Sequence, residues 1–472
     1  MEKGFYKRVL ILALPIAAQS LITIGVNMLD NIMVSNIGEG DIGETALSAV
    51  ALANQYINIY HVLCMGLGMG ASVLVARYWG MRDKEPEKAM TALRKSICIM
   101  VRLTLSLATV FALLTYFFPK EIIQMFVDKE EEMDVILNGI TYLEFSVVTF
   151  FFLGLSLTCT IVLRSVGQVR MPLYVSMGAF FVNLGANYAL IFGHFGCPKM
   201  GVAGAALGTL IARIYETSII CGYLLFVDKK IGFRLKHMLM KTSDLIGEYI
   251  RISIPVLVSD GILAAGNTAV AIVIGHLGKA FVAANSVTAT TQMMSSVMIQ
   301  GVCQAGAIVT GQTLGKGQRD AAQRQAYGFL GFGLALGLVS SAFIMIVREP
   351  VIRSFDLSDS TAALARQLMN AICLIVIFQA TNSIMTKGVL RGGGDTKMLM
   401  LADNIFLWIL AIPLGIIAGF VLHLSPFGIY VCLKFDQITK AIWCVIRLRS
   451  GKWIKRIKVG REYINEEQTA ET

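Results

Sequence analysis

The chain has 472 residues, of which 56% are hydrophobic and only 15% are charged, and its mean hydropathy is +0.67. Soluble globular domains carry about 25% charged residues. A composition this apolar excludes a disordered chain, a coiled coil and a water-soluble globule, and it predicts an all-α integral membrane protein.

Membrane-spanning stretches fill most of the sequence. A helix that crosses the hydrocarbon region needs about 20 mainly apolar residues. The chain contains twelve such stretches, which leave no room for a soluble catalytic domain. We therefore predict twelve transmembrane helices, at 9–37, 48–76, 91–118, 135–163, 172–193, 202–226, 248–275, 281–314, 326–347, 362–390, 399–422 and 427–446.

The distribution of Lys and Arg predicts the orientation. If both termini are cytoplasmic, the inner segments hold 30 of these residues and the outer loops hold 6. Because cytoplasmic loops carry an excess of Lys and Arg, this split predicts a protein of the plasma (inner) membrane with both termini on the cytoplasmic side. The net charge of +10 is then a topology signal, and it requires no nucleic-acid partner. The basic tail can also touch anionic lipid headgroups.

The two halves of the chain resemble each other. The segment TALSAVALANQ is echoed by VAANSVTATTQ, and LRSVGQVR is echoed by LRGGGDTK. Because six spans separate equivalent segments, both copies begin on the same side of the membrane and the repeat is parallel. This predicts two six-helix bundles, with an N-lobe at 1–226, a cytoplasmic linker at 227–247, a C-lobe at 248–447 and a basic cytoplasmic tail at 448–472.

At these segments, and at LDNIMVSNIG, YWGMRDKEPEKA and VNLGANYALIFG, the chain resembles the multidrug and toxic compound extrusion (MATE) family. The resemblance implies a monomeric secondary antiporter that exports cationic or amphipathic organic compounds in exchange for H⁺ or Na⁺ by alternating access, without a cofactor. The alternative is a lipid-linked saccharide flippase of the same wider group. A flippase favours a cleft lined with several arginines, and Arg102, Arg213 and Arg366 are scattered in the sequence.

Signatures of enzymes are missing from the sequence. It contains no P-loop ending in G-K-[ST], no H-E-x-x-H, no G-x-S-x-G and no cluster of His and Cys at metal-ligand spacing. We therefore expect no enzymatic activity, and we expect an ion gradient to supply the energy. A receptor or scaffold is disfavoured because no extramembrane domain is predicted.

Asp30 is the acid that most needs an explanation. A charge at the centre of a span costs about 2.5–3.5 kcal/mol on insertion scales. Asp30 follows Pro15 by fifteen residues, and the equivalent position after Pro255 is Val270, so the acid is not a packing feature of the repeat. A carboxylate withdrawn from water can exchange a proton, or hold Na⁺ together with other oxygens. The alternative is a carboxylate satisfied by neighbouring polar side chains.

The resemblance extends to a cation site around Asp30. It implies that Asp30, Asn183 and Thr209 form this site in the N-lobe, and Asn187 stands where family members have a second acid. With one carboxylate the site should hold Na⁺ more weakly, and proton binding to Asp30 alone is an open alternative. Each amide could instead be an interhelical hydrogen bond, which is worth about 0.6 kcal/mol.

The positions at which the second half has or lacks acids indicate which branch of the family the chain resembles. The NorM-like branch has C-lobe acids at positions that match Leu263 and Ala380, so this chain resembles the DinF-like branch instead. Asp260 is nevertheless acidic, and it is a candidate for attracting cationic substrate, with a structural role as the alternative. Glu144 has no evident local partner in the sequence.

Other membrane charges are predicted to be structural. Asp436 and Lys440 are four residues apart in a helix, and Arg213 and Glu216 are three apart, so each couple can form an ion pair. Asp403 lies one turn inside its span and is expected near the lipid headgroups.

Two prolines are candidates for helix bending. Pro15 and Pro255 lie early in the helices that start the two halves. Proline removes one backbone hydrogen bond and permits a kink. Bending of the first span on protonation of Asp30 would couple the ion to transport.

Overall fold

The structure is a computed structural model that describes residues 4–38, 41–126, 133–355, 358–456, 458–459 and 462–463. Within these residues the fold is helical, apart from the antiparallel pair β1 (Lys458–Val459) and β2 (Glu462–Tyr463). Ten helices of the described chain are long and apolar enough to cross a membrane, and one bent pair of helices adds an eleventh span. The prediction of an all-α multi-pass membrane fold is confirmed.

The helices of the first half follow the predicted spans. One span, at 135–163, is not a single helix: α5 and α6 meet at an angle of 57°. The helices are α1 (Phe5–Ser35), α2 (Asp41–Met81), α3 (Pro86–Phe117), α4 (Pro119–Gln124), α5 (Met133–Ser146), α6 (Thr149–Ser165), α7 (Arg170–Phe192), α8 (Val202–Gly222), η1 (Tyr223–Val227) and η2 (Leu235–Leu239).

The second half is less regular near its end. The predicted span at 399–422 contains two π-helical segments, and the span at 427–446 is broken at Lys434. The helices are α9 (Ile246–His276), α10 (Lys279–Gly315), α11 (Arg319–Ser354), α12 (Asp359–Ser383), η3 (Ile384–Leu390), α13 (Thr396–Asn404), η4 (Ile405–Ala411), α14 (Ile412–Ile416), η5 (Ile417–Val421), α15 (Pro426–Leu433) and α16 (Phe435–Arg449).

The chain forms two compact units. Unit 1 consists of Met1–Ala17, Ala76–Ala89 and Ile250–Thr472, and unit 2 consists of Ala18–Val75 and Met90–Tyr249. The units follow the two halves of the sequence, except that the start of α1 and the end of α2 group with the second half. The lobe boundaries proposed from the sequence stay a prediction.

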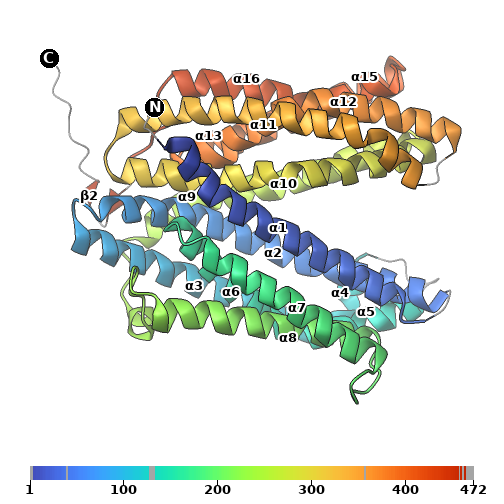
Figure 1. Ribbon diagram of the computed structural model, residues 1–472, viewed down its shortest axis with the longest axis horizontal. Coiled ribbons are helices and arrows are strands. Elements are labelled where there is room, and N and C mark those ends of the chain that lie inside the picture. The colour runs from blue at the N-terminus through green and yellow to red at the C-terminus, as the bar shows by residue number, and fades with distance from the viewer. Residues whose placement is uncertain are drawn as a thin grey trace. The chain divides into compact units, whose positions relative to one another are not determined.

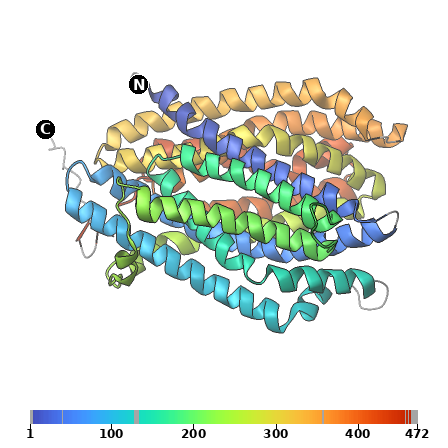
Figure 2. The ribbon, with the colours of Figure 1, turned by 60° about the horizontal axis from the view of Figure 1, so that its bottom comes forward.

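Unit 2 has a core of interlocking aromatic rings. The ring centres of Tyr60 and Phe150 are 5.0 Å apart, and those of Tyr60 and Phe111 are 5.2 Å apart. The Tyr60 hydroxyl donates a hydrogen bond of 2.8 Å to the Phe150 carbonyl oxygen, which satisfies its polar end inside the core. Beside this core α7 and α8 run along each other (Figures 1 and 2), and α7 carries the predicted cation-site amides.

The predicted linker is held against unit 2. Arg102 of α3 donates to the Met238 carbonyl oxygen at 2.6 Å. The Lys95 ammonium lies 2.7 Å from the Asp244 carboxylate. Both contacts join α3 to residues that follow α8, so the linker is docked along part of its length.

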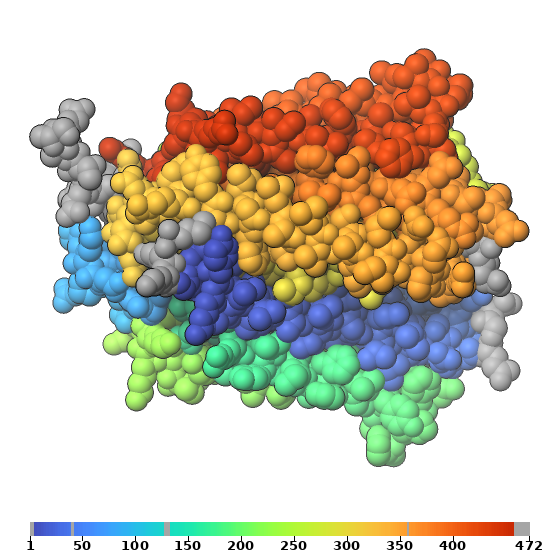
Figure 3. All heavy atoms as spheres, turned by 45° about the horizontal axis from the view of Figure 1, so that its top comes forward, coloured from blue at the N-terminus to red at the C-terminus, as the bar shows by residue number. Residues whose placement is uncertain are grey.

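In unit 1 the beginning of the predicted tail is packed. Trp453 is fully buried, and its indole nitrogen donates to Gln323 Oε1 at 2.7 Å. A Cβ at Gly393 would overlap this indole ring, which explains why the loop after the tenth predicted span needs glycine there. In the same unit α15 and α16 pack along α12 (Figure 3), and this packing positions the charges of α16.

Candidate functional site

The first cluster of predicted residues comes together in unit 2. The Asn187 side-chain nitrogen donates to Asp30 Oδ1 at 2.6 Å and lies 3.4 Å from Asn183 Oδ1. Asn183 and Asn187 are 4% and 1% exposed, one turn apart on the face of α7 that meets α1. The structure therefore joins three of the four predicted residues in one hydrogen-bonded group.

Thr209 of α8 reaches the group through a tyrosine that the sequence analysis missed. The Thr209 hydroxyl interacts with Tyr142 of α5, and Tyr142 is close enough to Asp30 to interact with it electrostatically. The Tyr142 hydroxyl donates to Asn54 Oδ1 of α2 at 3.3 Å. No local pattern marks Tyr142 or Asn54, because their contribution depends on how α2 and α5 pack around α7 and α8.

Charged side chains of α6 and α8 interact with Asp30 or with one another. Arg213 of α8 lies close enough to interact electrostatically with Asp30. Its guanidinium also lies 2.6 Å from Glu216 Oε2, which confirms the predicted ion pair. Arg164 of α6 also interacts electrostatically with Glu216, so the two carboxylates and two guanidinium groups balance when all four are ionised.

The oxygen atoms of the cluster suit a small hard cation. Asn187 Oδ1 is buried and has no hydrogen-bond partner among the described residues. A buried unpaired acceptor costs about 1–3 kcal/mol, so a ligand there would be favourable. Within the described chain no group of three or more His, Cys, Asp and Glu could hold a metal. The donor set is thus carboxylate and neutral oxygen, which suits Na⁺ or a proton better than a transition metal.

Asp260, the other predicted acid, lies in unit 1 with a basic partner. Its Oδ1 atom lies 3.2 Å from a guanidinium nitrogen of Arg391, which is 6% exposed. The ion pair balances the charge of Asp260, so the geometry favours the structural alternative over attraction of a cation. Pro15 and Pro255 lie inside the continuous helices α1 and α9, and their role in bending stays a prediction.

The charges of α16 were predicted in part. The Lys440 ammonium lies 3.1 Å from Asp436 Oδ2, which confirms that pair. It also lies 3.3 Å from Asp403 Oδ1. Asp403 is 7% exposed, because its carboxylate on α13 packs against Lys440, and its expected place near the headgroups stays a prediction. Glu144 is exposed on α5.

Comparison with known proteins places the chain in a family. The model of the MatE family matches residues 15–189 and 243–417, which together make up most of the chain. The chain belongs to the MatE family. Two matches of equal length, in order, also agree with the duplication found in the sequence. MatE proteins are transporters, so the chain is a multi-pass membrane protein of a transporter family.

Relatives of this MatE protein extend over nearly its whole length. It is 25% identical over 465 residues to "Probable multidrug resistance protein NorM" of Thermotoga maritima, which covers 98% of this chain and 96% of the relative. It is 24% identical to "Uncharacterized transporter YisQ" of Bacillus subtilis, with 90% of each chain covered. The DinF-like branch assignment stays a prediction.

Solved structures share the fold. A structure described as "Crystal structure of MATE in the bent conformation" has a TM-score of 0.83 and 19% identity, covering 95% of this chain and 97% of that one. A MOP superfamily transporter from Pyrococcus furiosus, described as having a binding pocket of reverse polarity, has a TM-score of 0.80 and 20% identity, covering 94% of this chain and 96% of that one.

Proposed function

We propose that this MatE protein exports organic compounds across the plasma (inner) membrane in exchange for H⁺ or Na⁺, by alternating access and as a monomer. The observation that carries the proposal is the polar group in which half-buried Asp30 meets two buried amides, and which offers one carboxylate and an unpaired amide oxygen on membrane-spanning helices. Curated relatives named for multidrug resistance support organic compounds as the substrates.

The coupling step follows from the charge of this group. Asp30 binds the ion, and Asn183, Asn187 and Thr209 supply neutral oxygen or hydrogen-bonding groups around it. Because ion binding cancels the charge of the carboxylate, it changes the free energy of any conformation in which that carboxylate is out of water. Bending of α1 at Pro15 is the motion through which this difference would act.

The arginines of the chain do not favour the flippase alternative. Arg102 binds the Met238 carbonyl oxygen, Arg213 pairs with Glu216, and Arg366 lies 3.1 Å from Glu349 Oε1. Each guanidinium is engaged within its own part of the fold.

A gradient experiment tests the exporter proposal. Purified protein in liposomes should export a fluorescent organic dye when either a pH gradient or a Na⁺ gradient is imposed, and it should not respond to ATP. We expect one of the two ions to drive export and to move in the opposite direction. Export that persists at the same rate without any ion gradient would contradict the antiport mechanism.

The proposed orientation, with both termini cytoplasmic, has a separate test. An impermeant thiol reagent added outside intact cells should label Cys197, which lies in the connection between α7 and α8. A cysteine placed at Lys241, in a background with Cys197 replaced by Ser, should react only after the membrane is opened. Labelling of that cysteine from outside would reverse the assignment.

A further inference from the structure

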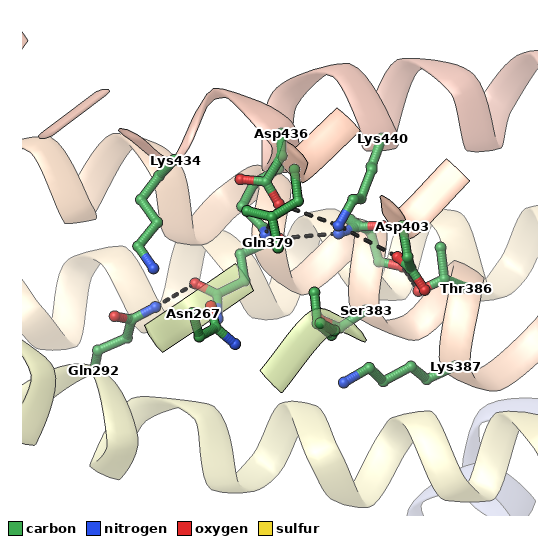
Figure 4. Close-up of a pocket in the computed structure, with 14 residues that line it drawn as sticks. Asn267, Gln292, Gln379, Ser383, Thr386, Lys387, Asp403, Lys434, Asp436 and Lys440 are labelled. Atoms are coloured by element: carbon green, nitrogen blue, oxygen red, sulfur yellow. Dashed lines mark hydrogen bonds and ion pairs between the residues drawn. The ribbon is translucent and has the colours of Figure 1, made fainter. Parts of the chain in front are cut away.

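Unit 1 contains a polar pocket that the proposed coupling site does not use. The pocket has a volume of about 170 Å³ and is lined by side chains from both ends of the second half of the chain. The charged side chains among them, which Figure 4 labels, are Lys387, Asp403, Lys434, Asp436 and Lys440. Pockets that enclose a drug-sized molecule measure about 300–1,000 Å³. This pocket therefore has room for the polar head of a ligand and not for a whole drug-sized molecule.

The two acids that line the pocket are already engaged. Asp436 Oδ2 accepts from Gln437 at 2.6 Å and lies 3.1 Å from the Lys440 ammonium. Asp403 Oδ2 accepts from the Ser259 hydroxyl at 3.0 Å, and its other oxygen lies 3.3 Å from Lys440. Lys440 thus bridges two carboxylates, and this group carries one net negative charge.

Two further lysines line the same pocket without forming an ion pair in the described chain, although Asp436 interacts electrostatically with Lys434. Lys434 is half-buried and Lys387 is exposed toward the pocket. In the described part of the chain neither side chain makes an ion pair, and Figure 4 shows both ammonium groups apart from the bridge at Lys440. Three lysines face two aspartates, so the pocket has one net positive charge.

Helix irregularities place these two lysines. Lys387 belongs to the π-helical segment η3, and Lys434 occupies the break between α15 and α16. Such π-helical insertions occur frequently at functional sites. The amide groups of Gln292 and Gln379, joined by a hydrogen bond of 2.6 Å, and of Asn267 add neutral donors to the same wall.

We propose that this pocket binds the carboxylate or sulfonate group of a monoanionic organic substrate, with Lys434 and Lys387 as its counter-charges. An ammonium group removed from bulk water is costly until an opposite charge accompanies it. One anionic group brings the pocket to neutrality, whereas a cation would double the imbalance. That the bound anion is then exported rests on the proposed export function. An anionic substrate differs from the cationic substrate that the sequence led us to expect.

Three matched fluorescent probes test the charge preference. They are 6-(dansylamino)hexanoate, its uncharged carboxamide, and the amine dansylcadaverine, which share one fluorophore on similar alkyl spacers. Equilibrium dialysis against the purified full-length protein in detergent measures the dissociation constant of each. We expect the carboxylate to bind about tenfold or more tightly than the carboxamide, since a hydrogen bond to a charged group is worth about 1.5–3 kcal/mol.

Lysine variants locate the effect in the pocket. Lys434→Met and Lys387→Met should each weaken carboxylate binding about tenfold and leave carboxamide binding nearly unchanged. Unchanged carboxamide binding shows that the methionine variants fold. Lys434→Arg keeps the positive charge and should retain carboxylate binding, which shows that charge is the determinant. Lys279→Met, at an exposed lysine at the start of α10, is the matched control and should change neither probe.

The outcomes separate this inference from the export proposal. Equal affinity of the wild type for carboxylate and carboxamide, tighter binding of the amine, or equal loss of both probes in the methionine variants would each overturn the pocket assignment. Ion-driven export of dansylcadaverine together with any of these results would leave the exporter standing. Lysine-dependent carboxylate binding supports the pocket even where liposomes show no ion-driven transport.

Discussion

Asp30→Asn is expected to reduce ion-driven export at least about tenfold while the protein still folds and binds substrate. Asparagine resembles protonated aspartate in size, and its side-chain oxygen can accept the hydrogen bond that Asn187 now donates at 2.6 Å. The variant therefore keeps the local packing and loses the charge that an ion must neutralise. The measurement is substrate-induced H⁺ or Na⁺ movement in proteoliposomes of wild type and variant, with equal amounts of reconstituted protein.

Two companion variants sharpen this result. Glu144→Gln removes an acid that is exposed on α5, and it should leave exchange unchanged. Gly208→Ala removes no polar group, but its Cβ would overlap Asn187 Oδ1 and displace that amide, so it should weaken coupling through geometry alone. If Asp30→Asn exchanges ion for substrate at the wild-type rate, Asp30 is structural and another acid must couple the ion.

Lys440→Met is expected to lower the free energy of unfolding of this MatE protein by about 3–5 kcal/mol, the range found when one member of a buried ion pair is removed. The side chains of Lys440 and Asp436 are each 2% exposed, and that of Asp403 is 10% exposed. Methionine fills the same volume, so the loss reports the two carboxylates left without a counter-charge. Thermal unfolding in one detergent, followed by tryptophan fluorescence, measures the change.

The control for this variant is another lysine of the same pocket. Lys434→Met removes an ammonium group without an acidic ion-pair partner in the described chain, so it should destabilise the protein far less than Lys440→Met. Combining Lys440→Met with Asp403→Asn should recover part of the loss, because one uncompensated charge is removed. An equal effect of the two single lysine variants would show that the ion bridge does not stabilise the fold.

Prediction from the sequence succeeded where the cause is local. Apolar length predicts a membrane-spanning helix because the bilayer core has a fixed thickness. Helical spacing predicts the pairs Arg213–Glu216 and Asp436–Lys440, because residues three or four apart share one face of a helix. Asn183 and Asn187 share a face of α7 for the same reason, so their joint approach to Asp30 follows once α1 lies against that face.

Contacts between distant helices were beyond such reasoning. Asp403 lies 37 positions before Lys440, and its expected place near the headgroups followed from its position within a span. The break at Lys434 and the bend between α5 and α6 are likewise set by how the helices pack, since neither position carries glycine or proline.

The sequence by itself therefore determined that this protein crosses the membrane many times, that its chain is a duplicated parallel repeat, and that Asp30 is an acid within a span that needs partners. These properties depend on composition, spacing and repetition, which can be observed in the amino-acid sequence without knowledge of the fold. Only the tertiary structure decided that Tyr142 and Asn54 complete the group around Asp30, that Arg391 balances Asp260, and that two lysines line a pocket without forming ion pairs in the described chain. Each of these depends on which helices meet, and at what depth, because electrostatic and hydrogen-bond energies fall steeply with distance.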